Sequence, residues 1–300
     1  MRTALIIAAA AAAAFAATAA RAAPPAPNAG PASPANTYGQ HLLNQAMREN
    51  KGVIIMMMHV TPPGSKGNVV VASNIGRFGK KADPDDMEVI TTGKSRLEIN
   101  KAGDHFEVEE VLKDVSGDTI GALGVVWPYK AGDDQQAHRR QAEAIRDKLA
   151  RRILHAGNLV DRWPYDPHFD DDSYAQALVD RTMAAHPEIK VLAIHATPPG
   201  SKTNVILGSN IGRIGKKADE DDLRVIDKGA TNKEVSENGK RFEAELPLND
   251  AHGRRIGALG VVLAYRAGED KAALVAHAEK IRDEIAAHIA SPASLVGKAS

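Results

Sequence analysis

The feature that most constrains this chain is an internal duplication. A second copy of the segment that starts at Tyr38 starts at Tyr174, 136 positions later, and the two align without an insertion or deletion. From His59 to Asp86, 21 of 28 positions match those from His195 to Asp222. A repeat of about 120 residues is much longer than a solenoid unit and long enough to bury its own core. The sequence therefore predicts two tandem domains, and positions identical in both copies are candidates for chemistry or for special backbone shapes.

The segments outside the two copies are assigned from composition. Residues 1–22 are predicted to be a signal peptide, because Arg2 precedes an apolar run that ends at a small-x-small site, Ala20–Ala22. Residues 23–36, rich in Pro and Ala, are expected to be a disordered lead-in. The domains are expected over 37–156 and 173–292, with a linker over 157–172 and a tail over 293–300. We therefore expect a periplasmic or secreted protein without a membrane span after signal cleavage.

Composition excludes several classes of site. The chain has no cysteine, so disulfides, thiolate metal sites, iron–sulfur clusters and a cysteine nucleophile are excluded. Lys and Arg together number 38, as do Asp and Glu, so no nucleic-acid partner is predicted. Aromatic residues make up 4% of the chain, which argues against a stacking platform for bases or sugars.

Hydrophobic periodicity predicts the same element order in both copies. An amphipathic helix from Tyr38 is followed by two strands around a Pro-Pro-Gly turn, a helix that starts at Pro84, three strands and a closing helix. In the first copy the strands are expected over 53–60, 68–73, 96–100, 106–113 and 120–126. The last of these is apolar throughout and should lie at the centre of the sheet. Each copy is therefore predicted to be an α+β domain, a five-stranded antiparallel sheet flanked by helices.

Two short motifs resemble a known family. They are VVVASNIGRFGK over 69–80 and the D-x-x-G-x-x-I-G-x-L pattern from Asp114 to Leu123, and both return in the second copy. They resemble the PAS-like extracytoplasmic sensor domains of the Cache (PDC) type, found in histidine kinases and chemoreceptors. The resemblance implies two tandem PAS-like domains, a small-molecule ligand and a membrane-bound signalling partner.

Histidine and asparagine at strand ends are the first candidate site residues. His59 and His195 precede the proline turn, where each either contacts a ligand or donates a hydrogen bond that stabilises the turn. One histidine per copy is too few for zinc, so no metal is predicted. Asn74 and Asn210 either contact a ligand or cap a turn.

Basic residues after the second strand form another candidate. They could hold a carboxylate or phosphate, or they could be a solvated turn that pairs with the aspartates that follow. Ser and Lys in the proline turn could bind an anion beside a glycine, or could form an exposed tip. The basic candidates are Arg77, Lys80, Arg213 and Lys216, and the turn candidates are Ser65, Lys66, Ser201 and Lys202.

No catalytic machinery is predicted. A triad of Ser65, His59 and Asp83 would lack a nucleophile elbow, and no cofactor motif is present. We expect an exported small-molecule-binding, sensor-like protein for an anionic ligand. The alternative is a periplasmic docking module that works with a membrane-bound partner.

Overall fold

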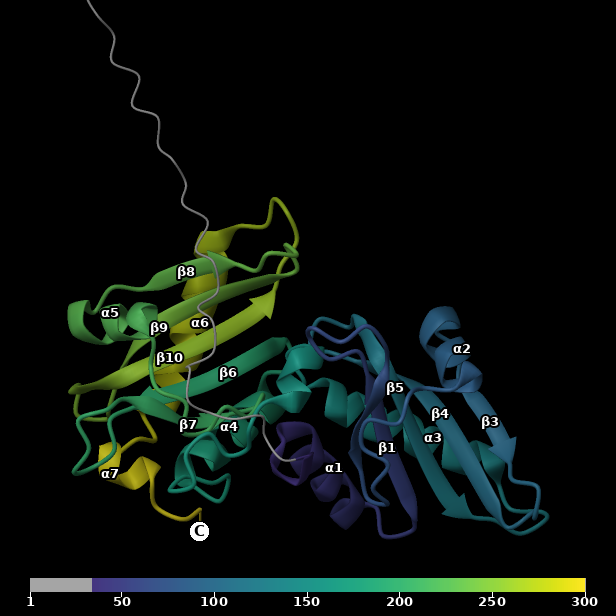
Figure 1. The fold of residues 1–300 in the computed structure, drawn as a ribbon. Coiled ribbons are helices and arrows are strands. Elements are labelled where there is room, and N and C mark those ends of the chain that lie inside the picture. Colours follow the sequence, from purple (N-terminus) through teal and green to yellow (C-terminus); the bar gives the residue numbers. More distant parts are fainter. Residues whose placement is uncertain (1–33, 300) are drawn as a thin grey trace, which may run out of the picture. The chain divides into compact units, whose positions relative to one another are not determined.

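The computed structural model describes residues 34–299, which contain two five-stranded antiparallel sheets with flanking helices (Figure 1). The predicted α+β class is confirmed, with one sheet formed by each copy, here called repeat 1 and repeat 2. The predicted signal peptide and all but the last three residues of the lead-in lie outside the described residues.

Repeat 1 contains η1 (Pro34–Asn36), α1 (Tyr38–Glu49), β1 (Ile55–Val60), β2 (Val69–Ser73), α2 (Pro84–Thr92), β3 (Arg96–Ile99), β4 (His105–Lys113), β5 (Thr119–Pro128), α3 (Gln135–Ala150) and η2 (Ala156–Val160). Repeat 2 contains α4 (Tyr174–Ala185), β6 (Ile189–Ala196), β7 (Val205–Ser209), α5 (Glu220–Lys228), β8 (Asn232–Val235), β9 (Arg241–Asn249), β10 (Arg255–Ala264), α6 (Lys271–Ala286) and α7 (Pro292–Leu295).

The two sheets have matching strand orders, β2-β1-β5-β4-β3 and β7-β6-β10-β9-β8. The apolar strand β5 lies at the centre, as predicted, and pairs with β1 on one side and β4 on the other. The proline turn joins β1 to β2 as an antiparallel hairpin, with Val60 opposite Val69. The Asn-Gly turn of repeat 2 likewise joins β8 to β9.

One face of each sheet carries the hydrophobic core. Met56, Met58 and Val60 are every second residue of β1, and all three are fully buried. They pack with residues of α1 and α3. In repeat 2, α4 and α6 cover the equivalent face. Figure 1 shows α3 and α6 lying along the sheets that they cover. These faces hold the apolar residues that the periodicity singled out.

The opposite face of the repeat 1 sheet is partly polar and is covered by α2. This helix begins, as predicted, with Pro84 in its first turn, and Asp83 and Asp86 form a reciprocal capping box. Val89 packs against the sheet beside Val111. That contact places the N-terminal turn of α2 next to the polar part of the sheet.

Within residues 34–299, no helix combines the length and the apolarity that crossing a membrane requires.

Candidate functional site

In repeat 1 a cavity of about 260 Å³ opens between the polar face of the sheet and the start of α2. Its walls come from β1, β3, β4, the start of α2 and the segment after β2, here called loop 74–80. The lining residues are Met57, His59, Arg77, Lys80, Asp83, Asp85, Asp86, Arg96, Glu98, Glu107 and Glu109. The structure therefore brings together three of the predicted site residues of repeat 1, His59, Arg77 and Lys80.

His59 faces the polar side of the sheet, because side chains alternate along β1 and its neighbours Met58 and Val60 face the core. The pairing of β1 with β2 shifts at this point, with Val71 of β2 as the extra residue. On the other side, β5 approaches so closely that a Cβ added to Gly121 would lie 1.8 Å from the His59 carbonyl oxygen. The two neighbouring strands thus hold a histidine that is only 3% exposed in the cavity wall.

His59 and Asp86, both buried, and the half-buried Glu109 form a group that is here called the His–Asp–Glu cluster. Nδ1 of His59 lies 3.5 Å from Oδ2 of Asp86, which also accepts a hydrogen bond from the Asp83 backbone N–H at 2.8 Å. Desolvation, a hydrogen bond with Asp86 and the charge of Asp86 raise the pKa of Glu109 well above its ordinary value. Desolvation lowers the pKa of His59, although Asp86 opposes this. At neutral pH the cluster therefore holds a neutral imidazole and a protonated Glu109, which can accept and donate hydrogen bonds.

Repeat 2 contains the same cluster. Nδ1 of His195 lies 3.5 Å from Oδ2 of Asp222, and burial lowers the pKa of this histidine. Desolvation and a hydrogen bond with Asp222 raise the pKa of Glu245. Nδ1 of His195, like that of His59, is buried without a hydrogen-bond partner among the described residues. The arrangement is therefore a property of the repeat.

Arg77 and Arg213 have left-handed backbones, with φ of 67° and 65°. A residue with a Cβ seldom adopts this conformation, which glycine or asparagine accommodates with less strain. Both copies keep arginine here despite this cost, and backbone strain of this kind is common at functional sites. Arg77 lines the repeat 1 cavity, and Arg213 lines a cavity in repeat 2, where its Nε is buried without a hydrogen-bond partner among the described residues.

Carboxyl groups outnumber cations around the repeat 1 cavity. Six acidic residues face three basic ones, Arg77, Lys80 and Arg96. Arg96 is occupied by Asp85 at 2.8 Å and Glu98 at 3.0 Å. Among the described residues, Arg77 forms no ion pair, so it is the cation in this wall that is available to a ligand.

The equivalent segment of repeat 2, here called loop 210–216, packs against the end of repeat 1. The Asn210 side chain donates to the Arg151 carbonyl oxygen at 2.8 Å, and Asn158 donates to the Ile211 carbonyl oxygen at 3.2 Å. A Cβ added to Gly212 would lie 2.6 Å from the Tyr38 ring. These contacts leave no room for another molecule at this part of the loop.

The apolar side chains of loop 210–216 are buried, whereas their counterparts in loop 74–80 are exposed. Ile211 and Ile214 are 3% and 1% exposed, whereas their counterparts Ile75 and Phe78 are 39% and 38% exposed. Leu154 of repeat 1 also lines the repeat 2 cavity, which has a volume of about 210 Å³. This cavity takes in Arg213, whereas His195 and Lys216 are not among its lining residues.

The predicted asparagines have a structural part in both copies. Asn74 accepts a hydrogen bond from the Met56 backbone N–H at 2.9 Å and donates to the Ile54 carbonyl oxygen at 2.8 Å. Asn210 makes the equivalent bonds to the backbone of Leu192 and Lys190. Their amides join the end of β2 or β7 to the adjacent strand. This is a structural role of the kind that the sequence left open as the alternative to ligand contact.

The predicted turn residues lie outside both cavities. The Ser65 hydroxyl donates to the Gly67 carbonyl oxygen at 2.9 Å, and Ser201 does the same to Thr203 at 3.2 Å. Lys66 and Lys202 are exposed at the tips of these turns. The geometry of the turns therefore comes from local hydrogen bonds.

Sequence reasoning missed the acidic half of the site. The sequence pattern offers Asp86 only as one of the aspartates that could pair with the basic turn, and it does not single out Glu107 or Glu109. The signal was available in part, because Asp86 and Glu109 both recur 136 residues later, as Asp222 and Glu245. What the sequence could not supply was the packing of α2 that brings Asp86 against β4.

Comparisons with known proteins add little to this description. No family model and no curated protein matches the chain. Among solved structures, the repressor BlcR of Agobacterium tumefaciens is 10% identical over 37% of this chain and 67% of that one, with a TM-score of 0.26. A C-terminal segment of PelD from Pseudomonas aeruginosa PAO1 is 18% identical over 81% and 74%, with a TM-score of 0.26. An RNA-binding light-oxygen-voltage receptor is 12% identical over 77% and 98%, with a TM-score of 0.19. Scores this low carry no argument, so fold and site rest on the elements of this chain.

Proposed function

We propose that this protein is an exported, non-catalytic, sensor-like module of the Cache type that binds one small polar molecule in the repeat 1 cavity. The observation that carries the proposal is the cavity itself. There Arg77, held in a left-handed conformation and without an ion pair among the described residues, lies near the His–Asp–Glu cluster. Cavities with a few convergent polar groups and perturbed pKa values are the usual place for a ligand.

The charges around the cavity define the ligand. Arg77 would hold an anionic group, because its guanidinium favours a carboxylate or phosphate. Six carboxyl groups line the same space, so a ligand with negative charge alone would be repelled. A protonated amine placed near the acidic residues at the start of α2 would remove that repulsion. The proposed ligand is therefore a small zwitterion, with its anionic end at Arg77.

The absence of catalysis is part of the proposal. The residues that line the cavity include no hydroxyl or thiol nucleophile. Ser65 lies in the turn between β1 and β2, and its hydroxyl is hydrogen-bonded to Gly67. A neutral imidazole beside a carboxylate can orient a ligand without a chemical step.

A calorimetric titration of the purified protein would test this proposal with three groups of compounds: zwitterionic amino acids, dicarboxylates and diamines. Zwitterions should bind, and Arg77→Ala should weaken binding at least tenfold because it removes a charge-assisted hydrogen bond. Lys66→Ala, at the turn tip, is the matched control and should bind normally. Binding by dicarboxylates alone would restore the purely anionic ligand, and no binding in any group would refute the proposal.

A docking module for a membrane-bound signalling protein is the second candidate. It is favoured by the exposure of Ile75 and Phe78, whose counterparts in repeat 2 are buried by contacts within the chain. A photo-crosslinking residue at position 78 should capture a membrane protein in the native envelope, whereas the same residue at position 66 should not. Equal capture at both positions would contradict specific docking through loop 74–80.

A further inference from the structure

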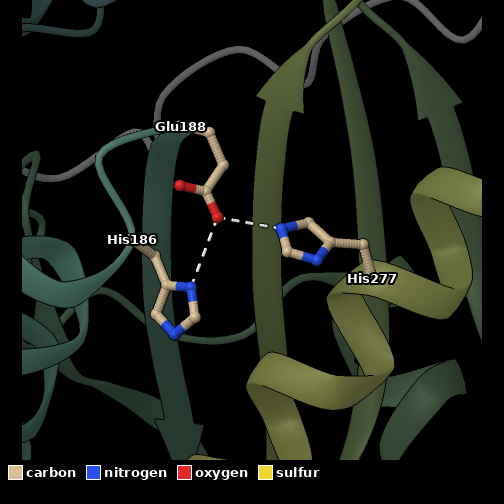
Figure 2. A group of neighbouring side chains, drawn as sticks. All are labelled: His186, Glu188 and His277. Carbon is tan, nitrogen blue, oxygen red and sulfur yellow. Dashed lines mark hydrogen bonds and ion pairs between the residues drawn. The ribbon is translucent and has the colours of Figure 1, made fainter.

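Two histidines and a glutamate from distant segments converge in repeat 2. His186 directly follows α4, Glu188 directly precedes β6, and His277 lies on α6. Figure 2 shows the Glu188 carboxylate between the two imidazoles. One ligand atom from each residue lies within 4.8 Å of the others. None of the three residues lines either of the two cavities described above.

The two distances from Glu188 to the histidines are close to those of a tetrahedral metal centre. Oε1 of Glu188 lies 2.9 Å from Nε2 of His277 and 3.3 Å from Nδ1 of His186. Zinc bonds of about 2.0–2.1 Å arranged tetrahedrally place neighbouring ligand atoms about 3.3 Å apart. An ion could therefore replace the present contacts with only small side-chain movements.

A fourth residue orients one of the imidazoles. Oε2 of Glu284 lies 2.8 Å from Nε2 of His186, on the nitrogen opposite the one that faces Glu188. Glu284 and His277 lie seven residues apart on α6, so they share a helix face. A carboxylate that holds the far nitrogen of a ligand histidine is the usual companion of a protein zinc site.

Repeat 1 shows that the fold does not need these four residues. Asn50, Gly52, Gln141 and Lys148 occupy the equivalent positions. There, Gln141 donates a hydrogen bond to Asn50 at 3.2 Å, which joins the same two helices through neutral amides. The two copies thus use the same junction with and without metal-binding groups.

We propose that His186, Glu188 and His277 bind one divalent transition-metal ion, with Glu284 as a positioning residue and water in the open coordination position. Imidazole ligands favour Zn²⁺, Ni²⁺ and Cu²⁺ over Mg²⁺ and Ca²⁺, which prefer oxygen. The site is accessible to ions because Glu188 and His277 retain 45% and 39% side-chain exposure. A bound ion would link α6 to the start of β6.

The test is calorimetric titration of the metal-stripped, tag-free protein with ZnCl₂, together with its melting temperature. One Zn²⁺ per chain should bind and raise the melting temperature, and MgCl₂ should do neither. His277→Asn should weaken binding more than tenfold. Glu284→Gln should weaken it by about ten- to a hundredfold, as is typical for the partner of a ligand histidine.

Repeat 1 supplies the matched control. A triple variant, Asn50→His, Gly52→Glu and Gln141→His, should raise the count from one Zn²⁺ to two, since a Cβ at Gly52 meets nothing closer than 3.9 Å. Urea unfolding without metal would show that each variant folds. Zinc binding that is unchanged in the double variant His186→Asn/His277→Asn would overturn the proposal, because it would assign the ion to other histidines.

Discussion

The two copies of the repeat share their sheets, helices and His–Asp–Glu clusters, and they differ in what covers the loop after the second strand. Loop 74–80 leaves Ile75 and Phe78 exposed beside an open polar cavity, whereas loop 210–216 is packed against the end of repeat 1. Eight of the nine residues from Ser73 to Lys81 are identical to their counterparts, and only Phe78 differs, so identity alone would suggest one shared role. The difference teaches that two nearly identical loops can line an open cavity in one copy and build an interface in the other.

The largest expected difference between the copies concerns a buried ion pair that only repeat 1 has. Arg146 contacts Glu110 at 2.7 Å, and Glu110 is 1% exposed, whereas the position equivalent to Glu110 is Leu246. Arg146→Ala should cost about 3–5 kcal/mol of unfolding free energy, because it leaves a buried charge without a partner. Arg282→Ala, its matched control in repeat 2, should cost within about 0.5 kcal/mol. Urea denaturation measures both, and similar losses would contradict the prediction.

The second largest difference in unfolding free energy is expected when the equivalent isoleucines of the two loops are truncated. Ile211→Ala removes a side chain buried at the interface and should cost about 3 kcal/mol. Ile75→Ala removes an exposed side chain and should cost within about 0.5 kcal/mol. The comparison requires the same denaturation measurement, and a large loss for Ile75→Ala would show that loop 74–80 is covered in solution.

A glycine pair gives a smaller difference. Gly76 and Gly212 both have positive φ, so alanine at either position is strained by about 1–2 kcal/mol. Gly212→Ala should cost about 1–3 kcal/mol more, because its Cβ would meet the Tyr38 ring, whereas the space around Gly76 is open. Melting temperatures of the two variants would test this, with equal temperatures counting against the packed loop.

The smallest difference between the copies is expected in the pH dependence of stability that Glu109 and Glu245 cause, because both copies have this acid. The pKa of Glu109 and of Glu245 is raised, so the folded protein holds protons that the unfolded chain releases. Their contribution to stability is therefore complete below a pH of about 4.3 and is lost as pH rises toward the folded-state pKa. Glu109→Gln and Glu245→Gln should each reduce this loss by a similar amount, as measured by unfolding free energy between pH 5 and 9. Glu98→Gln, an exposed control, should leave the pH dependence unchanged.

The histidines add a dependence of opposite sign. The pKa of His59 and of His195 is lowered, so the folded protein resists a proton that the unfolded chain accepts. Their contribution is present above a pH of about 6.5 and is lost as pH falls toward the folded-state pKa. His59→Gln should flatten the acid side of the profile, and an unchanged acid side would show that another group titrates there.

Much of the fold could be predicted from the sequence, because it depends on local patterns. The alternation of apolar and polar residues predicts β4, and the uninterrupted apolar run predicts the central position of β5. The Asp83-Pro84 pair predicts the start of α2. The histidine and arginine of the site could be predicted from residue type, since His59 and Arg77 do line the cavity. The acidic residues could not, because their position in the site depends on the tertiary contact between α2 and β4. The unequal burial of Ile75 and Ile211 depends on packing between the copies, which a pattern shared by both cannot reveal.

The packing of loop 210–216 against repeat 1 uses different surfaces on the two copies, so it is a heterologous contact within one chain. Such a contact leaves one copy of the loop free. The same stretch of sequence is therefore under two different constraints in one molecule. Substitutions of the exposed Phe78 should be tolerated by the fold, whereas the same changes at the buried Ile214 should destabilise it.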